Sequence, residues 1–90
     1  MRDIHIPPSS LQQPQQPQQS SLADLPVGID AIVVNLLDTP EQQRCAELGF
    51  FRGAHVKVLI SGDPSLVSLN DARVAISRKY LANVNVSYFQ

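Results

Sequence analysis

Apolar and polar residues alternate through most of the chain after residue 29, and this alternation predicts five short β-strands. Successive side chains of a strand point to opposite faces, so the apolar positions of an alternating strand form one buried face. The predicted strands cover residues 30–37, 54–61, 66–69, 72–77 and 83–88. Five short strands joined by close turns indicate a mainly β domain with a strongly bent sheet or a partly closed barrel.

A short helix is predicted between the first two strands, in the run PEQQRCAELGFFRG at residues 40–53. Thr39 can cap its start, and Pro40 suits the first helical position because proline lacks the N–H that would be unpaired there. Gln42 lies where the partner residue of a capping box reaches back. A single helical turn at residues 78–82 is expected to connect the fourth and fifth strands.

The same run carries a clear helix end. Gly49, directly after Leu48, can adopt the left-handed backbone conformation that ends a helix, and Phe50 can fold back on the last turn, as in the Schellman motif. Gly53 then redirects the chain into the next strand. The two glycines are four residues apart, which leaves no room for a mobile loop. The helix exit and the strand entry should therefore be rigidly coupled.

Composition separates the first twenty residues from the rest. Between Leu11 and Ser20 the chain has six glutamines, two prolines, one leucine and one serine. These residues offer little apolar surface to offset the entropy cost of ordering the backbone. We therefore expect residues 1–20 to be a disordered Gln/Pro-rich tail and residues 21–90 to form one small domain.

Charge and hydropathy exclude several classes of function. The formal net charge is -1, whereas nucleic-acid binding usually draws on a strong excess of lysine and arginine. The longest strongly apolar run, at residues 31–37, is far shorter than the roughly 20 residues that span a bilayer. The tail lacks the long apolar stretch of a signal peptide. A cytoplasmic location without direct membrane insertion is therefore expected.

Few residues suit catalysis or metal binding. Cys45, the single cysteine, has no base nearby in sequence, and its place in the middle of a helix is typical of a small buried hydrophobic residue. His55 lies on the polar face of its strand and is expected to be solvated. Glu41 and Glu47 diverge on the helix, and no histidine and carboxylate pair has the spacing of an iron(II) site. We expect no enzyme activity, no cofactor and no dedicated metal site.

The helix exit is the first candidate for a surface that binds a partner. Two adjacent phenylalanines cannot easily both point inward, so one of them is either exposed or covers the end of the helix. Charged residues flank them on both sides. The candidate set is Arg44, Glu47, Phe50, Phe51 and Arg52.

The second candidate surface is the outer face of the first strand. Ile32 and Val34 lie opposite the expected core positions Ala31 and Val33, so this strand is apolar on both faces. Such a strand needs a cover on its outer side. The cover is either the domain's own helix, a partner protein, or another copy of the chain through weak self-association.

Four segments, taken in order, resemble the FeoA family of ferrous iron transport proteins. They are LADLPVG at residues 22–28, Ala31-x-Val33, ELGFFRG at residues 47–53, and RVAISR at residues 73–78. The most specific element is the structural motif formed by Leu48, Gly49 and Phe50 with Gly53. The resemblance covers residues 21–90.

This resemblance implies a small SH3-like β-barrel of about five strands, with a short helix inserted between strands one and two. It also implies a small cytosolic accessory protein of ferrous iron uptake. Such a protein acts by contact with FeoB, the membrane iron transporter with a GTP-binding domain, and reaches the inner face of the membrane only through it. Related modules form the C-terminal domain of metal-dependent repressors. The alternative is therefore a stand-alone SH3-like regulatory module that binds a peptide or a regulator.

Overall fold

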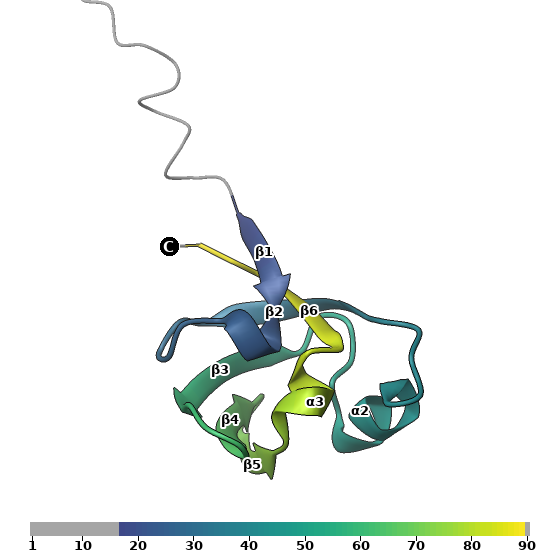
Figure 1. The fold of residues 1–90 in the computed structure, drawn as a ribbon. Coiled ribbons are helices and arrows are strands. Elements are labelled where there is room, and N and C mark those ends of the chain that lie inside the picture. The colour runs from purple at the N-terminus through teal and green to yellow at the C-terminus, as the bar shows by residue number, and fades with distance from the viewer. Residues whose placement is uncertain (1–16, 90) are drawn as a thin grey trace, which may run out of the picture.

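A single antiparallel sheet of six strands dominates the computed structural model, which describes residues 17–89 (Figure 1). The strands are β1 (Gln18–Ser21), β2 (Ala31–Leu36), β3 (His55–Ile60), β4 (Ser65–Leu69), β5 (Ala72–Ile76) and β6 (Val84–Tyr88). Their order in the sheet is β1-β6-β2-β3-β4-β5. The helical segments are η2 (Leu22–Asp24), α2 (Gln42–Leu48) and α3 (Arg78–Leu81).

The mainly β fold with a helix between the first two predicted strands is confirmed, since α2 connects β2 to β3. The sheet has one strand more than expected and is not closed, because β1 and β5 form its two edges. The extra strand corrects the expected extent of the tail. Gln18 pairs with Tyr88 and Ser21 pairs with Asn85. The pairing depends on backbone N–H and C=O groups, which even a run of glutamines and serines supplies. The rest of the expected tail, residues 1–16, lies outside the described residues.

The strand β6 carries the clearest part of the core. Val84 and Val86 are fully buried and Tyr88 is buried, as their alternation with polar residues predicts. This strand lies between β1 and β2, so both of its edges are paired. Burying one valine side chain contributes roughly 1.5–3 kcal/mol to folding. The order of the strands therefore leaves neither edge of β6 open to solvent.

The edge strand β5 departs from the expected pattern. Alternation along the strand predicts that Ala72, Val74 and Ile76 point into the core, but only Ile76 is buried, and Ala72 is exposed. A strand at the edge of a sheet has one neighbour instead of two, so its first residues are less covered. The turn between β4 and β5 has Asn70 at a positive φ of 53°, a conformation that asparagine tolerates.

The start of α2 differs from the predicted cap. The Thr39 hydroxyl donates a hydrogen bond to Asn83 Oδ1 over 2.6 Å, so it does not cap the helix. Instead, the Gln42 N–H donates to the Thr39 carbonyl oxygen over 3.0 Å and forms a turn ahead of the helix. Asn83 is buried, and its Nδ2 donates to the Lys79 carbonyl oxygen over 2.7 Å. This side chain thus ties the start of α2 to α3.

Candidate partner-binding site

The end of α2 has the geometry that its sequence predicts. Gly49 has a φ of 108°, and its N–H donates to the Ala46 carbonyl oxygen over 3.0 Å. The Phe50 N–H donates to the Cys45 carbonyl oxygen over 3.1 Å, which completes a Schellman motif. A Cβ atom on Gly49 would lie 3.3 Å from Leu69 Cδ2, so the glycine also permits close approach of the helix end to β4.

The segment after the helix is tied to β2. The Gly53 N–H donates to the Val33 carbonyl oxygen over 2.8 Å, and the Val33 N–H donates to the Ala54 carbonyl oxygen over 2.9 Å. The Ala54 N–H donates to the Phe51 carbonyl oxygen over 2.9 Å. These hydrogen bonds hold the residues around Phe51 between the helix end and the sheet, as the spacing of the two glycines suggests.

The two adjacent phenylalanines have opposite environments. Phe50 is fully buried in the core, whereas Phe51 has 62% of its surface exposed. Phe50 therefore cannot take part in a surface contact, and its place in the expected set of partner-binding residues is corrected. It follows the glycine of the Schellman motif, a position whose side chain usually packs back on the last turn of the helix. The chain then turns, and Phe51 points to solvent.

Phe51 lies beside a shallow groove between the helix exit and the β4–β5 hairpin. The groove has a volume of about 510 Å³. It is lined by Leu48, Gly49, Phe51, Leu69, Asn70, Asp71 and Ala72. Apolar side chains thus come from three elements, with polar side chains at the turn. An exposed aromatic residue next to a concave apolar surface is typical of the centre of a protein interface.

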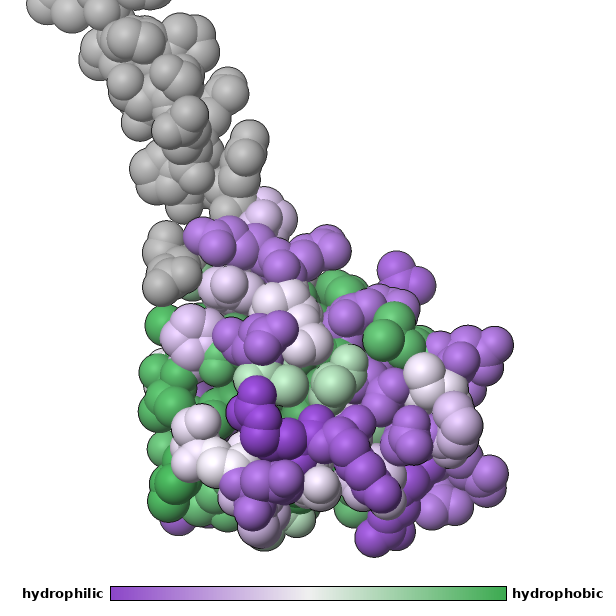
Figure 2. All heavy atoms as spheres, viewed as in Figure 1, coloured by the Kyte–Doolittle hydropathy of each residue, from purple (hydrophilic) through white to green (hydrophobic). Residues whose placement is uncertain are grey.

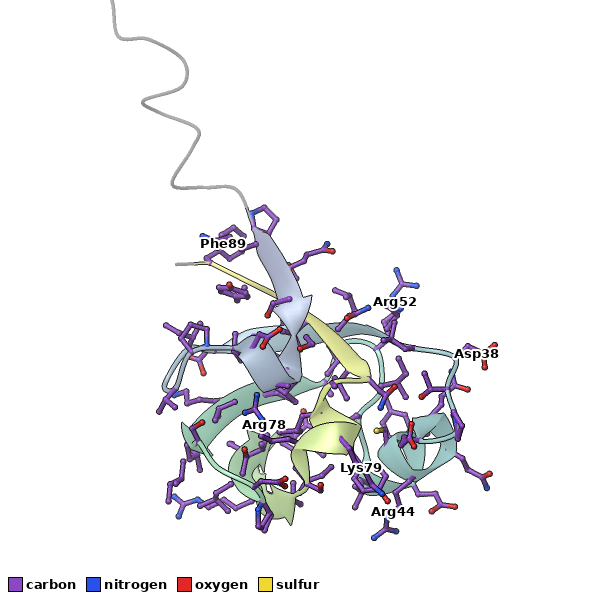
Figure 3. The ribbon with its side chains drawn as sticks, in the orientation of Figure 1. Asp38, Arg44, Arg52, Arg78, Lys79 and Phe89 are labelled. Carbon is purple, nitrogen blue, oxygen red and sulfur yellow. The ribbon has the colours of Figure 1, made fainter. Side chains whose placement is uncertain are left out.

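The charged residues of the helix exit do not form one patch with Phe51. Arg44 makes an ion pair of 3.7 Å with Glu47, and both side chains are more than half exposed. Such a surface pair contributes little to stability. Figure 3 shows Arg44 and Arg52 pointing away from each other, on opposite sides of this end of the molecule. Among the predicted residues, the structure thus places Phe51 at the groove and turns Arg44 away from Arg52.

The outer face of β2 is only partly covered. Ala31 and Val33 are buried as expected, whereas Ile32 and Val34 are half-buried. The helix α2 lies beside α3 (Figure 1), and the Cys45 thiol donates to the Tyr80 carbonyl oxygen over 3.4 Å. Ile32 lines a second groove of about 540 Å³, together with His55, Tyr88, Phe89 and neighbouring residues.

Comparison with known proteins decides the family. A family model described as the FeoA domain matches residues 20–88, which is most of the chain. The chain belongs to the FeoA family.

Several solved FeoA structures are similar to this chain over most of its length. An iron uptake regulatory protein (FeoA) is 30% identical, covers 77% of this chain and 94% of its own, and has a TM-score of 0.68. The FeoA of Stenotrophomonas maltophilia complexed with zinc is 27% identical, with coverages of 73% and 87% and a TM-score of 0.65. The FeoA protein of Chlorobium tepidum is 30% identical, with coverages of 78% and 70% and a TM-score of 0.66. No protein with a curated description matches the chain.

The comparisons also support the SH3-like fold. The S. maltophilia protein is described as a prokaryotic SH3 domain protein and a possible activating factor of bacterial ferrous iron transport. A manganese-dependent transcriptional repressor has a TM-score of 0.72 over 82% of this chain and 44% of its own. Its identity of 16% shows a shared fold alone.

The cysteine and the described histidine of this FeoA-family chain lie on different elements, Cys45 on α2 and His55 on β3. Cys45 is fully buried, as predicted, and burial raises the pKa of its thiol, with a further rise from the charge of Glu41. His55 is exposed on β3, also as predicted, and its backbone N–H donates to Asn70 Oδ1 over 3.1 Å. Within residues 17–89, no group of three or more histidines, cysteines or acidic residues is placed to hold a metal ion. In the same range, no helix has the length and apolar character needed to cross a bilayer.

Proposed function

We propose that this FeoA-family chain is a small cytosolic accessory protein of ferrous iron uptake. It acts by protein–protein contact with the cytosolic region of a FeoB-type iron transporter. Two observations support this function. The family match spans residues 20–88, and similar structures are described as an iron uptake regulatory protein and as a possible activating factor of bacterial ferrous iron transport. The chain also offers an exposed aromatic residue next to an apolar groove.

Phe51 is the residue that we expect to contribute most to the proposed contact. It has 62% of its surface exposed, although it lies in a segment fixed by the Schellman motif and by hydrogen bonds to β2. A side chain on a fixed backbone loses little entropy on binding. Burying a whole phenylalanine contributes roughly 1.5–3 kcal/mol, so covering the exposed part of Phe51 is worth about 1–2 kcal/mol. This corresponds to about a tenfold change in affinity.

The proposed mechanism is differential binding to two states of the transporter. A bound accessory protein shifts an equilibrium between two states only if it binds one of them more tightly. Leu48 and Leu69 line the apolar groove beside Phe51. We expect this groove to fit the transporter's surface in one of its two states and not in the other. We therefore expect the affinity to depend on the guanine nucleotide bound to the transporter.

A binding measurement between the full chain and the cytosolic region of the transporter tests this function. Phe51→Asp should weaken binding by about tenfold or more, because it places a charge where the complex would bury the ring. Phe89→Asp is the matched control, since Phe89 also has 62% of its surface exposed but lies near the second groove. Circular dichroism checks that both variants are folded.

The outcomes separate the two candidate surfaces. Loss of binding with Phe51→Asp and retention with Phe89→Asp supports the helix exit as the interface. The reverse result moves the contact to the groove lined by Ile32. If both folded variants bind as the wild type does, neither phenylalanine belongs to the interface. Absence of wild-type binding, with and without guanine nucleotide, would overturn the proposed function itself.

A further inference from the structure

The two open edges of the sheet differ in composition. The edge strand β1 consists of four polar residues, QQSS, and follows Pro17, which makes it a poor template for further pairing. The other edge strand, β5, reads ARVAI. Within residues 17–89, β5 pairs with β4 alone, and Figure 1 shows it at the margin of the molecule. Its free backbone N–H and C=O groups can therefore accept another strand.

An apolar row leads across the outer face of the sheet to this edge. Ile60 of β3 pairs with Leu66 of β4, and Leu66 pairs with Ala75 of β5, so the three side chains lie side by side on one face. Ile60 has 60% of its surface exposed, Leu66 is half-buried and Ala75 is exposed. Figure 2 shows apolar side chains gathered at the left margin of the molecule, where β3 ends in Figure 1.

A polar and basic row runs parallel to the apolar one. Lys57 pairs with Ser68, and Ser68 pairs with Arg73 on β5. The Lys57 ammonium lies 3.3 Å from the carboxylate of Asp30, which neutralises its charge locally. Arg73 is the charged side chain that reaches the β5 edge. Any strand added to β5 must therefore continue an apolar row at Ala75 and avoid a cation opposite Arg73.

We infer that β5 pairs antiparallel with β5 of a second copy of this chain, with the two-fold axis at Ala75. This register places Ala75 opposite its own counterpart, so the two apolar rows join into one row across both sheets. It places Arg73 opposite Ser77 of the second copy, and Val74 opposite Ile76. Ser77 follows the last residue of β5 and has an extended backbone, with φ -66° and ψ 143°. Its carbonyl oxygen accepts the Tyr80 N–H over 3.0 Å at the start of α3, so the pairing ends at this residue. The contact is isologous, as in most two-fold dimers.

Neighbouring registers are less favourable. An axis at Arg73 would place two guanidinium groups directly opposite each other, and like charges in this position destabilise strand pairing. An axis at Val74 would place Arg73 opposite Ala75 and interrupt the joined apolar row with a charge. The complementarity of β5 with itself at the Ala75 register is the reason to choose a second copy over an unrelated extended peptide. A contact of five-residue strands is small, so weak, concentration-dependent association is expected.

Cysteine crosslinking tests both the contact and its register. In the Ala75→Cys variant of the full chain, the two new thiols lie directly opposite each other, within the Cα separation of about 7 Å that a disulfide allows. Oxidised glutathione should therefore convert this variant to a covalent dimer. The wild type is a background control, since its one cysteine, Cys45, is buried.

Two further exposed alanines supply matched controls. In the Ala72→Cys variant the two thiols are offset by six residues along the strand, or about 20 Å, and should not form a disulfide. Ala82→Cys, in the exposed turn after α3, reports on chance collisions.

The inference also predicts that Ala75→Glu weakens self-association in sedimentation experiments by about fivefold, because two carboxylates then face each other.

Preferential crosslinking at position 75 supports the proposed pairing. Equal crosslinking at positions 72, 75 and 82, crosslinking at 72 in place of 75, or a monomer at every concentration overturns it. If Ala75→Cys stays monomeric and Ala75→Glu instead loses binding to the transporter, the β5 edge binds the transporter and self-pairing is wrong. The test is independent of the proposed function, since crosslinking of the isolated chain needs no transporter.

Discussion

The Gly49→Ala substitution tests whether the end of α2 holds the helix against the sheet. Gly49 has a φ of 108°, which L-amino acids with a side chain rarely adopt. A Cβ atom at this position would also lie 3.3 Å from Leu69 Cδ2, so the leucine side chain must shift by a few tenths of an ångström. The substitution thus combines backbone strain with a steric conflict at the groove beside Phe51.

The expected destabilisation follows from these two effects. A residue other than glycine held at such a φ costs about 1–3 kcal/mol. The reduced entropy of the unfolded chain offsets about 0.4–1 kcal/mol of this cost. We therefore expect a loss of about 1–2 kcal/mol in the free energy of unfolding from the backbone alone, with a further contribution from Leu69. In a domain of this size, this corresponds to a fall in Tm of about 5–15 °C.

Gly53→Ala is the matched control for this prediction. Gly53 has a φ of 91°, but a Cβ atom there meets no heavy atom within 4 Å. Urea denaturation of both variants, followed by circular dichroism, separates backbone strain from the contact with Leu69. Gly49→Ala should be the less stable variant. If it is as stable as the wild type, or more stable than Gly53→Ala, the close approach of helix and sheet does not contribute as argued.

Two further predictions concern neighbouring buried side chains. Phe50→Ala should lower the free energy of unfolding by about 3–5 kcal/mol because it empties a fully buried site. Phe51→Ala should change the free energy of unfolding by less than about 0.5 kcal/mol. If urea denaturation gives similar losses for the two variants, the assignment of one ring to the core and the other to the surface is contradicted. Burial and the charge of Glu41 raise the pKa of the Cys45 thiol above its ordinary value of 9.0, so the unfolded chain loses this proton first as the pH rises. Stability should therefore fall between pH 9.0 and the folded pKa in the wild type. A Cys45→Ala variant should lack this component, and identical pH profiles of the two proteins would refute it.

Much of the fold could be predicted from the sequence because it depends on local patterns. The alternation of Val84, Val86 and Tyr88 with polar residues predicts β6, and the buried positions are the expected ones. Gly49 predicts the end of α2, because few other residues adopt its backbone conformation. The order of segments around Leu48 and Gly53 also identified the family.

The remaining features of the fold depend on contacts between segments that are distant in sequence, so local patterns did not predict them. The β1 strand has no apolar pattern and forms because β6 offers an edge to it. The Thr39 hydroxyl donates its hydrogen bond to Asn83, which is 44 residues away, so the helix start lacks the predicted cap. No local rule decides between such competing hydrogen-bond partners.

The candidate site shows the same division between local and tertiary information. The sequence by itself determined that two adjacent phenylalanines follow a helix end and cannot easily share one environment. Only the tertiary structure decided that Phe50 fills the core and Phe51 faces solvent beside Leu69. It also turned Arg44 and Arg52 apart and left β5 as an open, apolar edge. The physical reason is that exposure depends on which segments meet in space, whereas the pattern along the chain records only which residues are able to be buried.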